Sequence, residues 1–262
     1  MNPNNYWSNK DKNAELAKEH TKEMQEKYAN DTTDSIINTI MYSADQNDNL
    51  SNNQEMEILI EDLDTVHAGS KYCNDGKVAL LNFASYTNPG GRFLQGSKAQ
   101  EECLCHSSNL YNVLSKLDDF YNFYKWNREN RNNALYLNRG LYSPHILFQY
   151  KEKSFYCDVI TCAAPNKFAA QKYKNISDEE NTKALESRIK FVLKIAKENQ
   201  VDTLILGAYG CGVFGQNPYE VASIFKKYLE TTYRCFKKVI FAIPGTNINL
   251  KAFKEIFEGG TL

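Results

Sequence analysis

Two adjacent glutamates, Glu101 and Glu102, follow a glycine-bearing segment and Gln100. A carboxyl group can protonate a leaving oxygen, and a second carboxylate can hold a sugar or stabilise positive charge that develops on it. Adjacent residues on a helix point about 100° apart, so these two side chains cannot face each other across a glycosidic bond. We therefore expect one catalytic and one binding carboxylate. The simpler alternative is that both acids only favour the positive end of a helix.

Two glycine-bearing loops offer places for phosphate groups. Each follows an apolar stretch and leads into a helical pattern: 82-NFASYTNPGGRFLQGSKAQEE-102 and 207-GAYGCGVFGQNPYE-220. Glycines let backbone N–H groups approach phosphate oxygens, and the helix start that follows supplies unpaired donors. Two such loops on one sheet predict a diphosphate site. Neither loop matches the nucleotide-binding P-loop or GxGxxG in its proper context, which disfavours a Rossmann dehydrogenase.

The second loop also carries an aromatic residue and a cysteine. Phe214 can pack against a ribose or a base, or it can simply fill space beneath the loop. Cys211 could be a nucleophile, but no histidine stands in a recognisable relation to it. A cysteine between glycines is equally useful for being small.

The elements around these residues predict an α/β fold. Short apolar runs rich in Val, Ile, Leu and Phe alternate with helical patterns, as expected of strands buried on both faces. Long loops at 84–98, 118–142 and 165–176 interrupt the pattern, and ligands of open α/β sheets bind beyond the carboxyl ends of the strands. The expected strands are 56–60, 77–83, 155–164, 202–208 and 236–243, and the expected helices are 99–117, those after 177-SDEE-180 and 217-NPYE-220, and 250–257.

The N-terminal part has a different composition, rich in Asn, Lys and Glu. We expect residues 1–55 to form a helical extension packed on a catalytic domain of residues 56–262. Two helices are predicted there and no strand, with Asp34 capping a second helix that carries Ile36, Ile37, Ile40 and Met41. The segment 47-NDNLSNNQ-54 is typical of a linker.

The composition is that of an ordinary globular protein. Of 262 residues 42% are hydrophobic and 13% aromatic, and 31 Lys and Arg against 32 Asp and Glu give a net charge of -1, which excludes a disordered chain and disfavours a dedicated duplex-DNA or membrane-surface binder. We expect a cytoplasmic protein, because the first 25 residues lack an apolar signal region. Seven scattered cysteines and four isolated histidines predict neither a disulfide framework nor a metal site, and no cofactor is expected.

Three segments resemble one family. The stretches 81–108, 158–166 and 204–218 are similar to the microbial-type (bacterial-like) poly(ADP-ribose) glycohydrolases of the macrodomain superfamily, and the likeness runs from about residue 10 to about residue 257. It implies a three-layer α/β/α macrodomain with a mixed central sheet and a helical N-terminal extension. The implied reaction is hydrolysis of ribose–ribose O-glycosidic bonds, which releases ADP-ribose from chain ends. The expected partner is poly(ADP-ribose) or an ADP-ribosylated macromolecule, with ADP-ribose as product and neither a membrane nor sequence-specific nucleic-acid binding.

The resemblance also implies roles for single residues. Glu102 would be the general acid for the departing ribose oxygen and then the base for water, and Glu101 would hold ribose hydroxyls. Gln100 would support the loop geometry, and Phe214 would position the terminal ribose. Backbone amides would cradle the diphosphate at Gly90, Gly91, Gly210, Cys211, Gly212 and Val213.

One departure from the family pattern concerns Arg92, which stands where the third loop glycine is expected. If that position needs a left-handed backbone, an arginine would strain or crowd the loop; alternatively its guanidinium could clamp a phosphate. Two alternatives to a poly(ADP-ribose) glycohydrolase stay open. One is a mono-ADP-ribosyl hydrolase that acts on a protein or nucleic-acid adduct, and the other is a non-catalytic ADP-ribose binding module. Asp64 either contacts the adenine edge or caps the helix that follows it.

Overall fold

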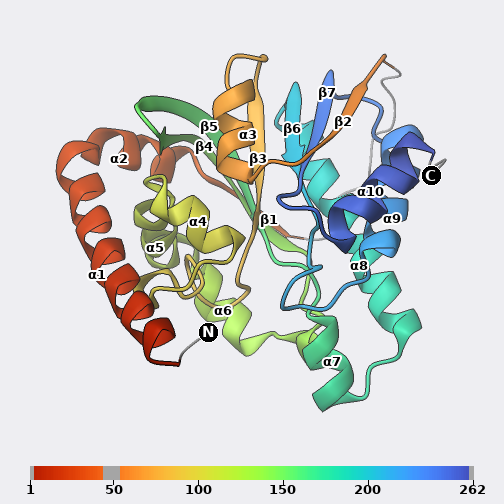
Figure 1. The fold of residues 1–262 in the computed structure, drawn as a ribbon, viewed down its shortest axis with the longest axis horizontal. Helices are drawn as coiled ribbons and strands as arrows, with labels where there is room; N and C mark the ends of the chain where they lie inside the picture. The colour runs from red at the N-terminus through yellow and green to blue at the C-terminus, as the bar shows by residue number, and fades with distance from the viewer. Residues whose placement is uncertain (1–2, 44–53, 260–262) are drawn as a thin grey trace.

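A seven-stranded mixed sheet forms the middle layer of the protein (Figure 1). The computed structural model describes residues 3–43 and 54–259. In the order β1-β4-β5-β3-β6-β7-β2, neighbouring strands from β5 to β2 run parallel, whereas β4 is antiparallel to both β1 and β5. The strands are β1 Ile40–Ser43, β2 Glu57–Glu61, β3 Val78–Phe83, β4 Arg139–Tyr150, β5 Lys153–Cys162, β6 Thr203–Leu206 and β7 Lys238–Ala242.

Helices cover both faces of the sheet, because the central strands are apolar on both sides. Along β3, Ala79 and Leu81 pack into one core cluster, while Val78 and Leu80 pack into the other. The first cluster is closed by α8 Asp178–Glu198, α9 Pro218–Glu230 and α10 Ile248–Glu258. The second is closed by α3 Thr65–Tyr72, α4 Gln100–His106, α5 Leu110–Tyr121 and α6 Phe123–Glu129. The predicted three-layer α/β/α architecture is confirmed.

Two predicted helix starts are confirmed in detail. The Ser177 side chain accepts a hydrogen bond from the Glu180 amide, and the Glu180 carboxylate accepts one from the Ser177 amide, which completes a capping box for α8. Asn217 accepts from the Tyr219 amide at the start of α9, with Pro218 in the first turn.

Other boundaries differ from the sequence prediction. The helix expected over 99–117 is broken into α4 and α5, because the Ser108 hydroxyl accepts a hydrogen bond from the Leu110 amide and donates one to Leu104. The expected loop at 118–142 contains the end of α5, α6, the short helix η2 Asn132–Ala134 and the start of β4, and the loop at 165–176 contains α7 Lys167–Lys174.

The N-terminal segment forms α1 Pro3–Lys27 and α2 Ala29–Asn38. The expectation of no strand here is wrong: Ile40 and Met41 belong to β1 rather than to a helix, because they pair with β4. Asp34 lies inside α2 instead of capping it. The predicted linker falls almost wholly on residues 44–53, which lie outside the described residues.

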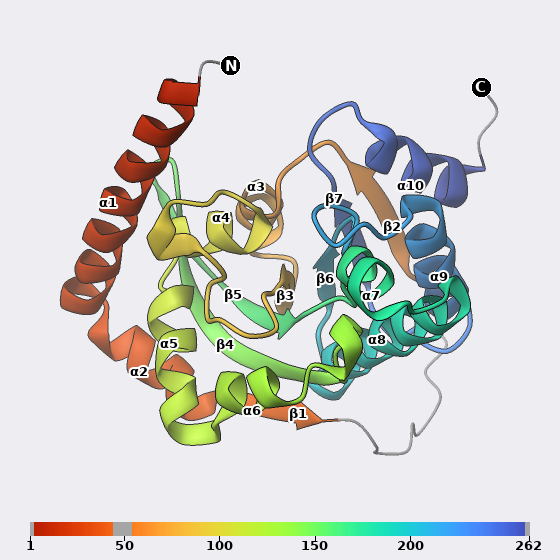
Figure 2. The same ribbon diagram turned by 90° about the horizontal axis from the view of Figure 1, so that it is seen from below.

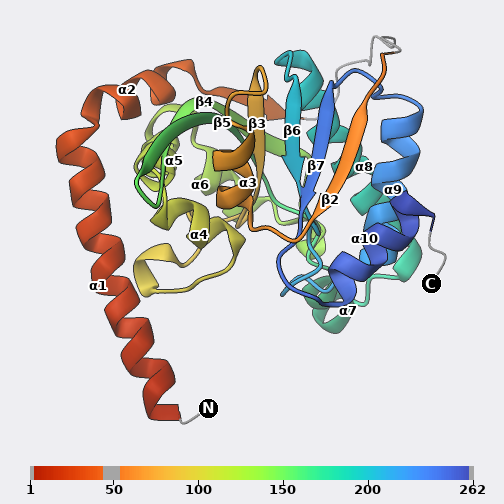
Figure 3. The same cartoon turned by 45° about the horizontal axis from the view of Figure 1, so that its top comes forward.

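Helix α1 packs against the glycine-bearing loop that leads from β3 to α4. It runs along the side of the molecule farthest from β2 (Figure 3). Gly96, at the end of the short helix η1 Phe93–Gln95, has φ +77°, and a Cβ atom there would lie 2.1 Å from the Lys10 carbonyl oxygen. Asn13 donates to the Gly96 carbonyl at 3.4 Å. The N-terminal helix therefore forms a wall of this loop.

We expect Gly96→Ala to lower the free energy of unfolding by about 2 kcal/mol or more, because it combines a left-handed backbone with a clash against backbone. Gly212→Ala is the matched control, since no atom lies within 4 Å of the added methyl group. Urea denaturation of both variants checks this. Equal losses at the two positions would contradict the close packing of α1 on the loop.

Candidate active site

The loops after β3 and β6 meet at one edge of the sheet, because parallel strands end on the same side. Figure 2 shows α4 and its preceding loop on one side of this edge and the loop after β6 on the other. Two cavities of about 340 Å³ and 170 Å³ lie between them. The cavities share lining residues from both loops, so they form one continuous cleft: Phe83, Ala99, Gln100, Ala208 and Gly212.

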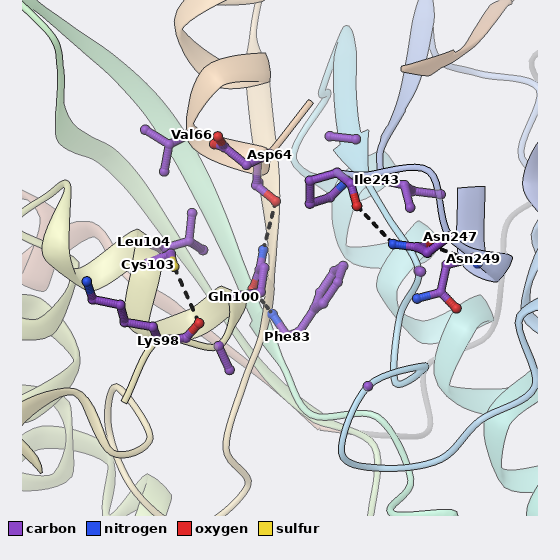
Figure 4. A pocket seen from close by; sticks show the side chains of 16 residues that line it. Asp64, Val66, Phe83, Lys98, Gln100, Cys103, Leu104, Ile243, Asn247 and Asn249 are labelled. Atoms are coloured by element: carbon purple, nitrogen blue, oxygen red, sulfur yellow. Dashed lines mark hydrogen bonds between the residues drawn. The ribbon is translucent and has the colours of Figure 1, made fainter. Parts of the chain in front are cut away.

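Gln100 ties the start of α4 to the end of β3. Its Oε1 accepts a hydrogen bond from the Phe83 amide at 2.8 Å (Figure 4). Its Nε2 donates to the Leu81 carbonyl at 2.8 Å and to the Thr65 hydroxyl at 3.2 Å. These bonds satisfy both ends of the side-chain amide. Gln100 therefore fixes where the two following glutamates lie.

Glu101 is buried, with 3% of its surface exposed. Its Oε2 accepts a hydrogen bond from the Ser85 amide at 2.6 Å, and its Oε1 accepts one from Asn82 Nδ2 at 3.2 Å. Burial raises the pKa of this carboxyl to about 8, and the neighbouring Glu102 adds to the rise, although the Ser85 and Asn82 donors oppose it. Glu101 is thus held firmly by the loop and by β3.

Glu102 is also buried, with 7% exposed, but its two oxygens differ. Oε1 accepts a hydrogen bond from the Arg92 amide at 2.9 Å. Oε2 makes no hydrogen bond with any of the described residues. A buried carboxylate oxygen without a donor is uncommon and costly. This oxygen is therefore the one carboxylate oxygen of the pair that has no donor among the described residues, and it lies behind the cleft wall, since Gln100 lines the two cavities but neither glutamate does.

Two consecutive glycines let the loop pass directly over the carboxylates. Gly90 and Gly91 have φ values of +63° and +60°. A Cβ atom on Gly91 would lie 2.5 Å from Oε1 of Glu102, and one on Gly90 would lie 2.7 Å from the ring of Tyr111. The Gly91 amide donates to the Asn88 carbonyl, and the Gly90 amide interacts with Glu101. Both amides expected to cradle a diphosphate therefore already have acceptors in the protein.

Arg92 does not strain the loop. Its φ is −113°, outside the left-handed region, and its side chain is exposed. The strain that a left-handed backbone would cause here does not arise, because the positive φ values of this loop belong to Gly90, Gly91 and Gly96. Arg92 contributes to the site through its backbone amide, which any residue except proline can supply.

The second loop keeps several amides open. The amides of Gly212, Val213 and Phe214 make no hydrogen bond with any of the described residues, and Val213 is 85% exposed. Gly210 has φ +75° and lines the smaller cavity with Phe214. Successive unpaired amides next to a cleft form an anion-binding concavity. Buried Gln216 braces this loop by donating to the Pro165 carbonyl and exchanging hydrogen bonds with Asn181.

Cys211 contributes little to either proposed role. Its amide donates to the Ala208 carbonyl at 3.1 Å. Burial raises the pKa of its thiol to about 12, which disfavours the thiolate that a nucleophile requires. The small side chain fits a tight turn, and that is the reading the geometry supports.

Two tyrosines that the sequence did not single out stand beside Phe214. The Tyr136 ring meets the Phe214 ring edge-on at 6.1 Å and stacks on Tyr86 at 4.3 Å. Tyr86 belongs to the first loop, so the three rings connect the two loops. Tyr136 lies in the segment that was expected to be an irregular loop, where no periodicity marked it as part of a site.

Asp64 has the capping role that the sequence allowed. Its Oδ1 accepts a hydrogen bond from the His67 amide at the start of α3. The residue also lines the larger cavity, together with Asn247 and Asn249 of the α10 start (Figure 4). Contact with an adenine edge stays a prediction.

Within residues 3–43 and 54–259, no three His, Cys, Asp or Glu side chains gather as a metal site would require. In the same part of the chain, no helix combines the length and apolarity needed to cross a membrane.

The raised pKa of Glu101 predicts a pH dependence of stability. A carboxyl with an ordinary pKa of 4.5 that rises to about 8 on folding holds its proton better in the folded state. Its contribution is therefore fully present below about pH 4.5 and is lost as pH rises toward 8. Glu101→Gln should flatten the fall in unfolding free energy between pH 5 and pH 8, because an amide does not titrate. The variant should still fold, because Asn82 can turn its unpaired Oδ1 toward the new amide. Urea denaturation across this pH range checks it; an unchanged slope would contradict it.

Comparisons with known proteins identify the family and the fold. The family model described as "Microbial-type PARG, catalytic domain" matches residues 9–150. The poly(ADP-ribose) glycohydrolase from Thermomonospora curvata bound to the inhibitor ADP-HPD is 27% identical, with 94% of this chain and 99% of that chain covered and a TM-score of 0.80. The poly(ADP-ribose) glycohydrolase from Deinococcus radiodurans in complex with ADP-ribose is 28% identical, with 87% and 97% covered and a TM-score of 0.79. No curated protein matches the chain. With more than half of its residues matched by the family model, the chain belongs to the microbial-type poly(ADP-ribose) glycohydrolases, which are hydrolases of the glycosidase class.

Proposed function

We propose that this protein hydrolyses the ribose–ribose O-glycosidic bond of poly(ADP-ribose) and releases ADP-ribose from chain ends, with Glu102 as general acid and base. The observation that carries the assignment is the unpaired, buried Oε2 of Glu102. Both oxygens of Glu101, by contrast, accept hydrogen bonds from the protein. The pair thus divides into one anchored carboxyl and one with a free oxygen.

The reaction follows from this division. Glu102 donates its proton to the departing ribose oxygen as the bond from the anomeric carbon to that oxygen breaks. Positive charge develops on the terminal ribose, and negative charge nearby stabilises it. Water then attacks the anomeric carbon and returns a proton to Glu102. Glu101, next to it in the same buried site, is assigned to the ribose hydroxyls.

The second loop is assigned to the substrate diphosphate. The amides of Gly212, Val213 and Phe214 have no acceptor among the described residues, whereas those of Gly90, Gly91 and Cys211 are occupied. Phe214 lines the smaller cavity and is placed to pack on the terminal ribose. The larger cavity, about 340 Å³ with Asp64 at its wall, is assigned to the adenosine. The whole ADP-ribose unit would then lie along the cleft.

Glu102→Gln should lower kcat for release of ADP-ribose from a poly(ADP-ribosylated) protein by about 100-fold or more, because the amide cannot supply the proton. The assay follows free ADP-ribose in metal-free buffer. Glu15→Gln, at an exposed position on α1, is the matched control and should keep wild-type turnover. Full activity of the Glu102 variant would overturn the assignment of the general acid. Tight binding of ADP-ribose with no release by the wild type would instead support a binding module.

Gly212→Leu should weaken ADP-ribose binding by about tenfold or more, because its side chain would fill the part of the cleft shared by both cavities. No atom lies within 4 Å of the new Cβ, so stability should change by less than about 0.5 kcal/mol. Isothermal titration with ADP-ribose, alongside urea denaturation, checks both parts. Unchanged affinity would mean that the ligand lies outside this cleft.

A further inference from the structure

A third cavity, of about 580 Å³, lies at the same edge of the sheet as the cleft. Arg139, which begins β4, pairs with Ser43 at the end of β1, and the next residue, Gly140, pairs with Cys162 at the end of β5. These residues therefore stand at the carboxyl edge of the parallel strands. We call this cavity the polar groove; its lining includes Trp126, Asn132, Tyr136, Arg139, Ala184 and Arg188.

The polar groove adjoins the cleft through one aromatic residue. Tyr136 lines the groove, and its ring meets Phe214, which lines the cleft. Tyr136 also stacks on Tyr86 of the first loop. A polymer that passes Phe214 on its way out of the cleft would therefore meet the groove next.

The groove contains two buried guanidinium groups without a counter-ion. Arg139 is 9% exposed; it donates to Asn127 and to the Met41 sulfur, and lies over the Trp126 ring at 4.3 Å. Its Nη1 makes no hydrogen bond with any described residue. Arg188 is 1% exposed and donates to the oxygens of Asn138, Ala163 and Leu135, none of which is a carboxylate.

Neither arginine forms an ion pair with a carboxylate of the described residues. A buried charge without a partner is costly, and a bound anion would offset that cost. Guanidinium groups suit phosphate in particular, because their donors match two phosphate oxygens at once. The groove thus suits an anionic ligand that can also pack against the aromatic rings of Trp126 and Tyr136.

We propose that the polar groove binds the diphosphate of the second ADP-ribose unit, the unit that departs when the terminal one is cleaved, with Arg139 as its direct contact. This inference rests on the proposed function. Every unit of the polymer carries a diphosphate, and the scissile bond joins the terminal ribose to the second unit. The groove would hold the departing chain while the cleft holds the terminal unit.

The test compares two substrates. One is a two-unit ADP-ribose oligomer; the other, ADP-ribosyl-adenosine, keeps the scissile bond but lacks the second diphosphate. Ala184→Glu adds a negative charge to the groove, and Ala184→Gln is its neutral control; both new residues favour a helix such as α8. We expect the ratio of kcat/KM for the oligomer to that for ADP-ribosyl-adenosine to fall about tenfold in the Glu variant and less than twofold in the Gln variant.

Arg139→Gln should lower the same ratio about tenfold, since it removes the guanidinium itself. An equal loss of kcat/KM on both substrates would overturn the proposal, and so would an unchanged ratio in both Ala184→Glu and Arg139→Gln. If Ala184→Glu leaves the ratio unchanged but abolishes inhibition by inorganic pyrophosphate, the groove takes a free anion and the polymer assignment is wrong. A wild-type protein that cleaves neither substrate would overturn the proposed function, and this inference with it.

Discussion

The burial of two adjacent carboxyl groups at the start of α4 is the constraint on which the site depends. Burying Glu101 beside Glu102 is unfavourable unless donors replace water. Those donors are Asn82 at the end of β3 and the amides of Ser85 and Arg92 in the loop. The loop can bring them close only because it passes over the carboxylates at Gly91. The course of the chain from β3 to α4 is therefore dictated by the two acids that it encloses.

Glycine serves a different purpose in each of the two glycine-bearing loops. In the first, glycines allow close approach, and the amides are consumed by the protein's own carboxylates and carbonyls. In the second, Gly210 permits a tight turn, and the three amides after Cys211 stay open. Both loops are held from behind, the first by Gln100 and the second by Gln216. One loop thus shapes the catalytic groups and the other leaves room for the ligand.

Much of the fold could be predicted, because its signals are local. The five parallel strands have continuous apolar runs. The Ser177 capping box can be recognised from the four residues 177-SDEE-180 alone. Strands β1 and β4 were not predicted from the sequence, because they are stabilised by pairing with strands from distant parts of the chain. β4 also contains a register shift after Ser143, and His145 there has a positive φ of 54°, so its polar interruption concealed a long strand.

The site was predicted in its residue types but not in its bonding. Motif and resemblance pointed to Glu101, Glu102 and both loops, yet neither indicates which amides are already occupied. That Arg92 has a negative φ is a property of the folded loop. Arg139 of β4 and Arg188 of α8 line one cavity only in the folded chain. Tyr136 is recognised as part of the site only through its ring contact with Phe214. Such features become visible only once distant segments are placed side by side.

The short strand β1 has a consequence for how the protein can be divided. It covers the first residues of β4, whose outer side would otherwise present unpaired N–H and C=O groups to solvent. Exposed strand edges invite pairing between molecules and aggregation. A chain cut where the composition changes, near residue 56, would lose both this cover and the helix that supports Gly96. We therefore expect a chain that begins near residue 56 to be less stable and more prone to aggregation than one that keeps the N-terminal segment.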